Sequence, residues 1–434
     1  MAKDFENAGN GLSEGRLLGV CLVAAMGGLL FGYDWVVIGG AKPFYEPYLG
    51  LDDPAKAWEA GFAMGSAVLG CIGGAIGLGW LPDRFGRKPS LILSAVLFTV
   101  SALWTAFATG YASFVAARIL GGVGIGLASN VSPVYIAEVS PPESRGRLVS
   151  LNQLTIVLGI IFAQLANYAT FRLASADISW RVMFGAEAVP AALFLVLALF
   201  IPESPRWGME GQQANDSKAG MLAVVRLLFE RRTLTILALG AFLAAFQQWC
   251  GINVVFNYAE EVFRAAGYDV SGVMFNQVIT GVVNCVFTVV AMCLVDKWGR
   301  RPMMLLGAGG LALLYTMLGA CYFFEVKGIA VLAVVLAAIA CYAMTLAPVT
   351  WVVLSEIFPD RVRGTAMSVA VAVLWTSCFG LTLTFKPINV SLGAAGTFWL
   401  YAAICAVGFA VVARFLMNNR VGVGKREKAG LRLD

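Results

Sequence analysis

Long apolar stretches recur along the whole chain of 434 residues, and they constrain the fold more than any other feature. A helix that crosses a bilayer needs about 20 consecutive apolar residues, and a run of 18 or more is typical of such a helix. Hydrophobic residues make up 59% of the sequence and charged residues only 13%, against about 25% charged in soluble domains. The chain is therefore expected to be an all-α membrane protein.

We predict twelve membrane-spanning helices, at residues 17–40, 60–81, 90–108, 111–137, 148–170, 181–201, 233–259, 271–295, 303–324, 328–354, 364–385 and 395–416. With both termini cytoplasmic, the inner loops hold 15 Lys and Arg and the termini 8, against 7 on the outer side. This asymmetry follows the positive-inside rule and predicts the orientation. We expect the plasma membrane, which in a bacterium is the inner membrane. The first sixteen residues are polar, which argues against a cleavable signal peptide.

The residue types that are present or missing narrow the possible chemistry. The sequence contains no histidine, which excludes a histidine metal site, a Ser-His triad and a histidine proton relay, so any proton carrier must be a carboxylate. The nine cysteines fall inside apolar spans and are expected to be small buried hydrophobes. We expect no metal, no cofactor and no enzymatic activity. The net charge of +5 reflects membrane topology and does not suggest nucleic acid.

Two motifs occur twice, in the same order, in the two halves of the chain. DRFGRKP at 83–89 returns as DKWGRRP at 296–302, and each joins two spans. YIAEVSPPESRGR and WVVLSEIFPDRVRG each place a glutamate seven residues before an arginine. Internal duplication explains such a repeat. It predicts an N-terminal six-helix bundle over 1–207, a short cytoplasmic linker over 208–232, and a second six-helix bundle with a short tail over 233–434.

The ordered set of motifs carries a resemblance to a known family. PESPRW at 202–207, RGR at 145–147, QQWCGIN at 247–253 and the two basic turns match sugar porter motifs. The chain resembles the sugar porter family of the major facilitator superfamily, and most closely its bacterial xylose–proton symporters. The resemblance implies two pseudo-symmetric six-helix bundles in a monomer, with the substrate site between them.

The chain departs from the family pattern in two places. About 25 residues separate Trp207 from Thr233, where sugar porters carry a substantial helical segment. The PETKG motif that follows the last span in the family is replaced by RFLMNNRVGVGKRE.

Three charges lie inside the predicted spans of the N-terminal half, at Asp34, Arg118 and Glu187. Each is about 10 Å below the outer surface at 1.5 Å per residue, which suggests one cluster. Arg118 is the only cation expected inside a span. In proton-coupled relatives the residue matching Asp34 is the proton-coupling site, and in passive glucose carriers it is asparagine. The resemblance therefore implies that these three residues couple proton to substrate. A static ion pair that orders this half is the alternative.

Polar and aromatic side chains in the spans suit a sugar, whose hydroxyls both donate and accept hydrogen bonds. The family resemblance implies contacts to substrate for one set of residues, namely Gln153, Gln247, Gln248, Asn253, Asn284, Trp351 and Trp375. Considered singly, such amides are as often contacts between helices. Gly251 and the polar residues around it predict a broken helix in the seventh span.

Four positions depart from the pattern of the xylose–proton symporters. They are Asn257 in place of a gating tyrosine, Ile160 and Leu374 in place of glutamines, and Ala347 in place of glycine.

The repeated basic motifs predict a cytoplasmic gate of charged residues, which are Arg84, Arg87, Glu138, Arg145, Lys297, Arg300, Glu356 and Arg363. The alternative is that they are only topology signals and solvated pairs.

These observations favour a proton-coupled symporter that imports a monosaccharide, a pentose or hexose such as xylose or glucose, by alternating access. Its expected partners are the sugar, the proton and the lipid bilayer. A facilitative uniporter is one alternative, and a non-transporting membrane sugar sensor is another.

Overall fold

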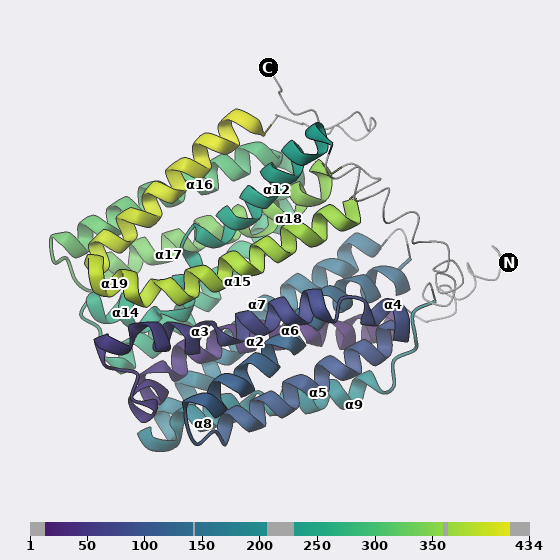
Figure 1. The fold of residues 1–434 in the computed structure, drawn as a ribbon, viewed down its shortest axis with the longest axis horizontal. Helices are drawn as coiled ribbons and strands as arrows, with labels where there is room; N and C mark the ends of the chain where they lie inside the picture. The colour runs from purple at the N-terminus through teal and green to yellow at the C-terminus, as the bar shows by residue number, and fades with distance from the viewer. Residues whose placement is uncertain (1–13, 142–143, 206–229, 359–362, 417–434) are drawn as a thin grey trace. The chain divides into compact units, whose positions relative to one another are not determined.

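The structure, a computed structural model, describes residues 14–141, 144–205, 230–358 and 363–416, and its ordered elements are helices (Figure 1). The chain forms two compact units. One consists of Met1–Asp52 and Phe62–Lys218, and the other of Asp53–Gly61 and Ala219–Asp434. The short central loop and the segment that replaces PETKG fall mostly or wholly outside the described residues.

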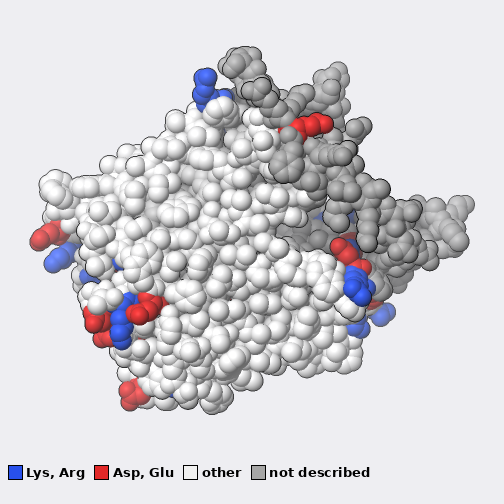
Figure 2. All heavy atoms as spheres, viewed as in Figure 1, with Lys and Arg blue, Asp and Glu red and all other residues white. Residues whose placement is uncertain are grey.

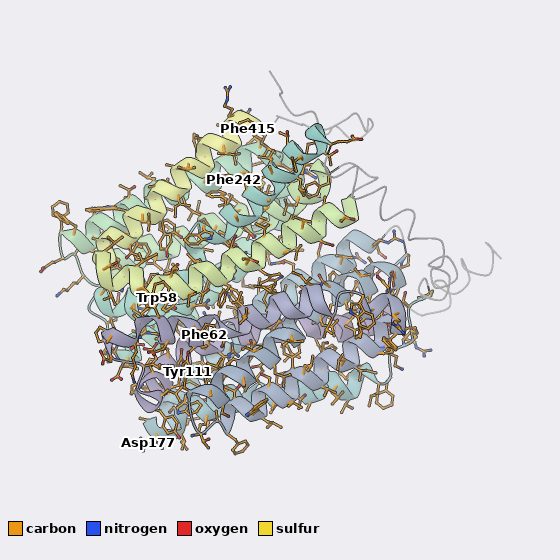
Figure 3. All side chains as sticks on the ribbon, viewed as in Figure 1. Trp58, Phe62, Tyr111, Asp177, Phe242 and Phe415 are labelled. Carbon is orange, nitrogen blue, oxygen red and sulfur yellow. The ribbon has the colours of Figure 1, made fainter. Side chains whose placement is uncertain are left out.

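The helices of the N-terminal half are α2 (Glu14–Leu49), the 3-10 helix η1 (Pro54–Lys56), α3 (Ala57–Ile72), the π-helix η2 (Gly73–Gly77), α4 (Leu81–Phe85), α5 (Arg87–Ala106), α6 (Tyr111–Val139), α7 (Arg145–Leu173), α8 (Ala176–Ala186) and α9 (Ala188–Ala198). Figure 3 shows Tyr111 and Asp177, in the first turns of α6 and α8, near the same end of the helices, as alternating crossings require.

The helices of the C-terminal half are α12 (Arg231–Trp249), α13 (Ile252–Asn257), α14 (Ala259–Ala265), α15 (Val270–Trp298), α16 (Arg300–Phe323), α17 (Ile329–Met344), α18 (Leu346–Ile357) and α19 (Arg363–Phe415). Helix α16 packs against α19, and helix α15 packs against α17.

Among the described residues, eleven helical stretches are long and apolar enough to cross a membrane. The last, Thr365–Phe415, has 51 residues, more than twice the length that one crossing needs. Its helix α19 is interrupted at Gly393, whose φ of 67° and ψ of 173° are not helical. This stretch therefore supplies two crossings, and the predicted all-α fold with twelve spans is confirmed. On the face shown in Figure 2, charged atoms gather near the helix ends and leave the surface between them uncharged.

The first span is longer than predicted. It was expected to end at residue 40, and α2 continues to Leu49 through two prolines, Pro43 and Pro47. Proline lacks an amide proton and usually ends or kinks a helix, but prolines are tolerated inside membrane helices.

This extension carries a second ion pair that the sequence did not predict. Lys42 and Glu46 are one turn apart, with 3.5 Å between Nζ and Oε2, and their side chains expose only 4% and 8%. Lys42 is thus a buried cation on the first long helix, in addition to Arg118 on α6. The signal was missed because a span that stops at residue 40 leaves Lys42 in a loop.

Close packing of α2 against α7 fixes the position of Asp34. A Cβ atom added at Gly32 would overlap the carbonyl oxygen of Ile156, and one added at Gly159 would overlap that of Leu29. Small residues at such contacts let membrane helices approach backbone to backbone. Asp34 lies two residues beyond Gly32, so this contact holds its backbone in place.

Candidate functional site

The two buried charges Asp34 and Arg118 form an ion pair inside the N-terminal unit. Nη1 of Arg118 contacts Oδ1 of Asp34, and Nη2 donates to the backbone oxygen of Asp34 at 3.2 Å. The two residues expose 1% and 2% of their surfaces. The structure thus brings together a carboxylate from α2 and a guanidinium from α6 that are 84 residues apart.

Glu187 is the third member of the cluster. It lies at the junction of α8 and α9, exposes 2% of its surface, and is close enough to interact electrostatically with both Asp34 and Arg118. The ring of Phe184, one turn earlier, lies 5.2 Å from Cζ of Arg118 in a cation–π contact. Tyr33 donates its hydroxyl to the carbonyl of Met183 at 3.4 Å, and so links α2 to the helix that leads to Glu187.

The ratio of one cation to two carboxylates determines what this cluster can bind. One guanidinium faces two carboxylates, and the carboxylates of Asp34 and Glu187 lie close enough to interact with each other as well as with Arg118. A buried unpaired charge is expensive, so a site with one cation and two acids is suited to holding one proton. The described residues contain no group of side chains that could hold a metal ion.

In the C-terminal unit, three of the amides that the family resemblance assigns to the sugar are hydrogen-bonded to one another. Asn253 donates to Gln248, and Nε2 of Gln248 donates to Oε1 of Gln247 at 3.1 Å. Gln247 in turn donates to the carbonyl of Ala347 at 3.5 Å, a long bond. All three amides are buried, with 4 to 9% of their surfaces exposed. The chain of amides keeps further donors and acceptors for a ligand, because each amide has more bonding positions than these contacts use.

A break in the seventh span positions these amides. α12 ends at Trp249, Gly251 adopts a left-handed conformation with φ of 88°, and α13 begins at Ile252. A Cβ atom at Gly251 would also press on the ring of Tyr401. The expected glycine-interrupted helix is therefore present. It places Gln247 and Gln248 before the break and Asn253 after it.

The other residues that are expected to contact the sugar differ in how far they are buried. Asn284 in α15 and Trp375 in α19 are buried in the C-terminal unit, with 7% and 5% exposed. Trp351 in α18 exposes 39% of its surface. Gln153 lies in α7 of the N-terminal unit and is half-buried.

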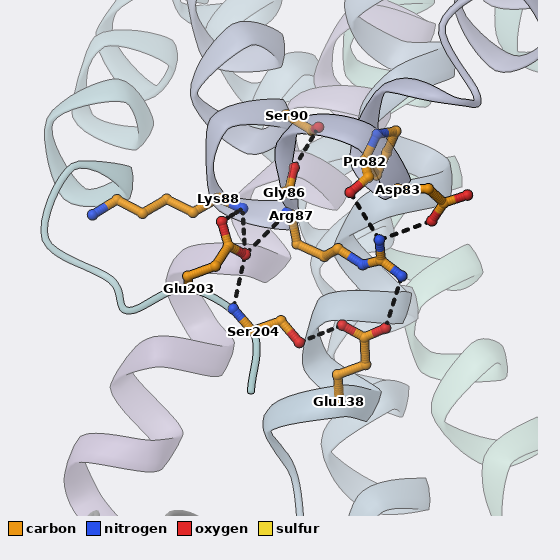
Figure 4. Close-up of polar contacts among 9 residues, drawn as sticks. All are labelled: Pro82, Asp83, Gly86, Arg87, Lys88, Ser90, Glu138, Glu203 and Ser204. Carbon is orange, nitrogen blue, oxygen red and sulfur yellow. Dashed lines mark hydrogen bonds and ion pairs between the residues drawn. The ribbon is translucent and has the colours of Figure 1, made fainter. Parts of the chain in front are cut away.

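At the turn between α4 and α5 of the N-terminal unit, Arg87 is the centre of a polar network (Figure 4). Its Nη1 bonds to Asp83 and to the carbonyl of Pro82, both at 2.8 Å, and its Nη2 bonds to Glu138 at 3.1 Å. Arg84 instead lies over the rings of Trp80 and Phe85, at 5.7 and 5.6 Å.

Two residues of this network, Glu203 and Ser204, were not among the predicted site residues. Glu203 accepts from the backbone amides of Arg87 and Lys88 at 3.0 and 3.1 Å, so it caps the start of α5. Ser204 donates its hydroxyl to the second carboxylate oxygen of Glu138. Both belong to the PESPRW motif, which thereby ties the end of the sixth span to the basic turn.

At the equivalent turn of the C-terminal unit, the described ion pair is more exposed. Nη2 of Arg300 pairs with Oε1 of Glu356 at 3.1 Å, and the two side chains expose 22% and 43%. Lys297 is exposed. Arg363 begins α19, and its side chain lies outside the described part of the chain.

The last predicted gate residue, Arg145, begins α7. Its buried Nε has no hydrogen-bond partner among the described residues.

Comparison with known proteins gives consistent matches over almost the whole chain. Residues 20–223 and 209–420 match the family model described as sugar (and other) transporter. The D-xylose-proton symporter of Escherichia coli K12 is 36% identical, covering 93% of each chain. The glucose facilitated diffusion protein of Zymomonas mobilis is 32% identical, covering 94% of this chain and 96% of the relative.

Among solved structures, the inward open conformation of the xylose transporter from E. coli matches with a TM-score of 0.82 at 35% identity. The match covers 93% of this chain and 97% of that one.

Proposed function

The chain belongs to the sugar porter family of the major facilitator superfamily, and we propose that it is a proton-coupled symporter that imports a pentose or hexose by alternating access. The family consists of multi-pass membrane transporters. The observation that carries the coupling assignment is the buried Asp34–Arg118 pair with Glu187 beside it.

Coupling in this proposal is an exchange of partners around Arg118. When Asp34 takes up a proton from outside, its attraction to the guanidinium is weakened, and Glu187 is the second carboxylate within reach. Release of the proton inside restores the Asp34–Arg118 pair. Each proton that moves inward supplies about 2.3 kcal/mol per 100 mV of membrane potential.

The proposed sugar-binding residues are Gln153 in the N-terminal unit and, in the C-terminal unit, the six residues described above. The linked amides of Gln247, Gln248 and Asn253 support this assignment, because they present donors and acceptors in a buried setting. Trp375 supplies an aromatic face, on which the apolar side of a sugar ring can pack.

The proposed cytoplasmic gate consists of the charged residues at the two basic turns. The bonds of Arg87 to Glu138 and of Arg300 to Glu356 support it. We further propose a monomer in the bacterial inner membrane with both termini cytoplasmic, supported by the distribution of Lys and Arg.

A facilitative uniporter is the second candidate, because one relative is described as a facilitated diffusion protein. Uptake by purified protein in liposomes separates the two. With an inward proton gradient, we expect radiolabelled xylose or glucose to accumulate above its external concentration, and a protonophore to abolish this accumulation. Equilibration without accumulation would support the uniporter. Absence of sugar counterflow would contradict transport altogether and leave a sensor.

A further inference from the structure

The sixth span is interrupted at Glu187, the second carboxylate of the charge cluster. The amide of Glu187 donates to the carbonyl of Phe184, three residues back, at 3.2 Å, and α9 begins at the next residue. In a regular α-helix this amide would donate to the carbonyl of Met183, four residues back. Pro190 follows closely, and proline interrupts a helix because it lacks an amide proton and its ring clashes with a carbonyl of the preceding turn. The carbonyl of Met183 is thus left without its regular helical donor.

Tyr33 supplies a donor for this carbonyl from another helix. Its hydroxyl donates to the carbonyl of Met183 at 3.4 Å, a long bond, and the residue exposes 3% of its surface. Because buried backbone carbonyls are almost always hydrogen-bonded, this bond stabilises the interrupted form of the span. Without the hydroxyl, the amide of Glu187 is the alternative donor that a regular helix provides. Its return to Met183 would change the turn that directs the Glu187 side chain.

The position of Tyr33 is itself fixed, next to Asp34 on α2. A Cβ atom added at Gly159 of α7 would lie 3.0 Å from the backbone nitrogen of Tyr33, so the two backbones are in close contact here. The Tyr33 side chain is close enough to Glu187 to interact with it electrostatically, and α2 packs against both α8 and α9. One helix thus carries the carboxylate that pairs with Arg118 and, one residue earlier, the hydroxyl that holds the turn at Glu187.

The other carboxylates of the N-terminal helices are poorly suited to replace Glu187 as the second partner of Arg118. The sequences of α5, α7 and α9 contain no Asp or Glu. Glu46 of α2 and Glu138 of α6 are paired with cations of their own. An exchange of partners at Arg118 therefore depends on where the backbone holds Glu187.

We propose that Tyr33 is a positioning residue for proton coupling, an inference that rests on the proposed function. Its hydroxyl holds the turn at Glu187 in the form that keeps this carboxylate within reach of Arg118. Asp34 and Glu187 can then alternate as the partner of the guanidinium while the backbone of the sixth span stays unchanged. Loss of the hydroxyl should therefore impair coupling more than it impairs stability or sugar binding.

The test is Tyr33→Phe, which removes only the hydroxyl. Wild type and variant are reconstituted in liposomes, and the accumulation of radiolabelled xylose or glucose under a proton gradient is divided by the rate of counterflow in the same preparation. This ratio corrects for the amount of active protein. We expect it to fall about threefold to tenfold in Tyr33→Phe, a range typical of the loss of one hydrogen bond. Sugar affinity, measured by isothermal titration, should stay close to that of the wild type.

Tyr135→Phe is the matched control. Tyr135 is also buried, and its hydroxyl also donates to a backbone carbonyl, that of Pro202 at 2.7 Å, but this contact lies beyond the end of α9. The control should lower the unfolding temperature and leave the ratio of accumulation to counterflow unchanged. Pro190→Ala is a second variant, which favours a regular helix through Glu187 without a change at Tyr33. It should lower the same ratio.

An unchanged ratio in Tyr33→Phe, or an equal fall in Tyr135→Phe, would overturn the positioning role. If Tyr33→Phe does not fold, an unchanged ratio in Pro190→Ala has the same consequence. A wild type that performs counterflow but never accumulates sugar would contradict the proposed proton coupling, and the positioning role with it. Accumulation by the wild type together with an unchanged ratio in Tyr33→Phe would remove only the role of Tyr33.

Discussion

Asp34 and Arg118 are almost completely buried, and burial of either charge alone would cost several kcal/mol. Pairing offsets this cost, but a buried pair contributes little net stability compared with apolar residues of the same size. Glu187 argues against a purely structural role for the Asp34–Arg118 pair, because a second buried carboxylate adds electrostatic repulsion that a static ion pair does not need. A cluster that exchanges a proton explains why all three charges are kept.

Asp34→Asn tests this explanation at the residue scale. The substitution keeps the size of the side chain and removes the group that binds the proton. We expect accumulation driven by a pH gradient to fall by at least tenfold, while exchange of sugar across the liposome membrane survives. Asp177→Asn, at an exposed carboxylate in the first turn of α8, is the matched control and should transport normally. Accumulation by Asp34→Asn at the wild-type level would remove Asp34 from the coupling site.

The residues that sequence could identify are those whose chemistry conflicts with their surroundings. A charge inside an apolar span stands out, and this is how Asp34, Arg118 and Glu187 were recognised. Glu203 could not be recognised in this way, because it lies just after a span and its partners are backbone amides, which have no residue signature. Lys42 was not recognised, because the prolines that follow it predict the end of the helix, whereas the helix continues through them.

At the scale of elements, the two basic turns share one backbone conformation. Gly86 has φ of 110° and ψ of 160°, and Gly299 has φ of 83° and ψ of 158°. This region is essentially restricted to glycine, and other residues there cost about 1–3 kcal/mol. Each glycine ends one helix and begins the next, so it directs the chain from one span into another. Such breaks are visible in sequence as glycines between apolar runs, whereas the continuation of α2 past Pro43 has no such signal.

Replacing each of these glycines with alanine gives a matched comparison. At Gly299, Pro302 is the only described residue that an added Cβ atom meets, at 3.9 Å, so Gly299→Ala should cost mainly the backbone strain. At Gly86 the added atom would overlap the carboxylate of Glu203 and displace the cap of α5. We expect Gly86→Ala to lower the thermal unfolding temperature in detergent more than Gly299→Ala does. An equal shift for both variants would show that the cap adds no stability.

At the scale of the whole molecule, the internal repeat predicted two six-helix halves, but it did not predict that the described ion pair at the second basic turn is more exposed than the pair at the first. The repeat includes the basic turn and the glutamate of each half. It does not include the PESPRW motif, since RFLMNNRVG stands after the last span. Glu138 therefore accepts from Ser204 of this motif as well as from Arg87. The contact with Ser204 comes from a segment outside the repeat, so the repeated motifs alone could not reveal it.

This asymmetry predicts unequal effects of the same substitution in the two halves. The Arg87–Glu138 pair is buried, with side chains 6% and 9% exposed, and removal of one partner of a buried pair costs about 3–5 kcal/mol. The Arg300–Glu356 pair is more exposed, and such pairs contribute about 0–1 kcal/mol. Glu138→Gln should therefore lower both the unfolding temperature and the rate of sugar counterflow several-fold more than Glu356→Gln. If Glu356→Gln lowers sugar counterflow as much as Glu138→Gln does, the Arg300–Glu356 pair must have a role in the transport cycle beyond its small contribution to stability.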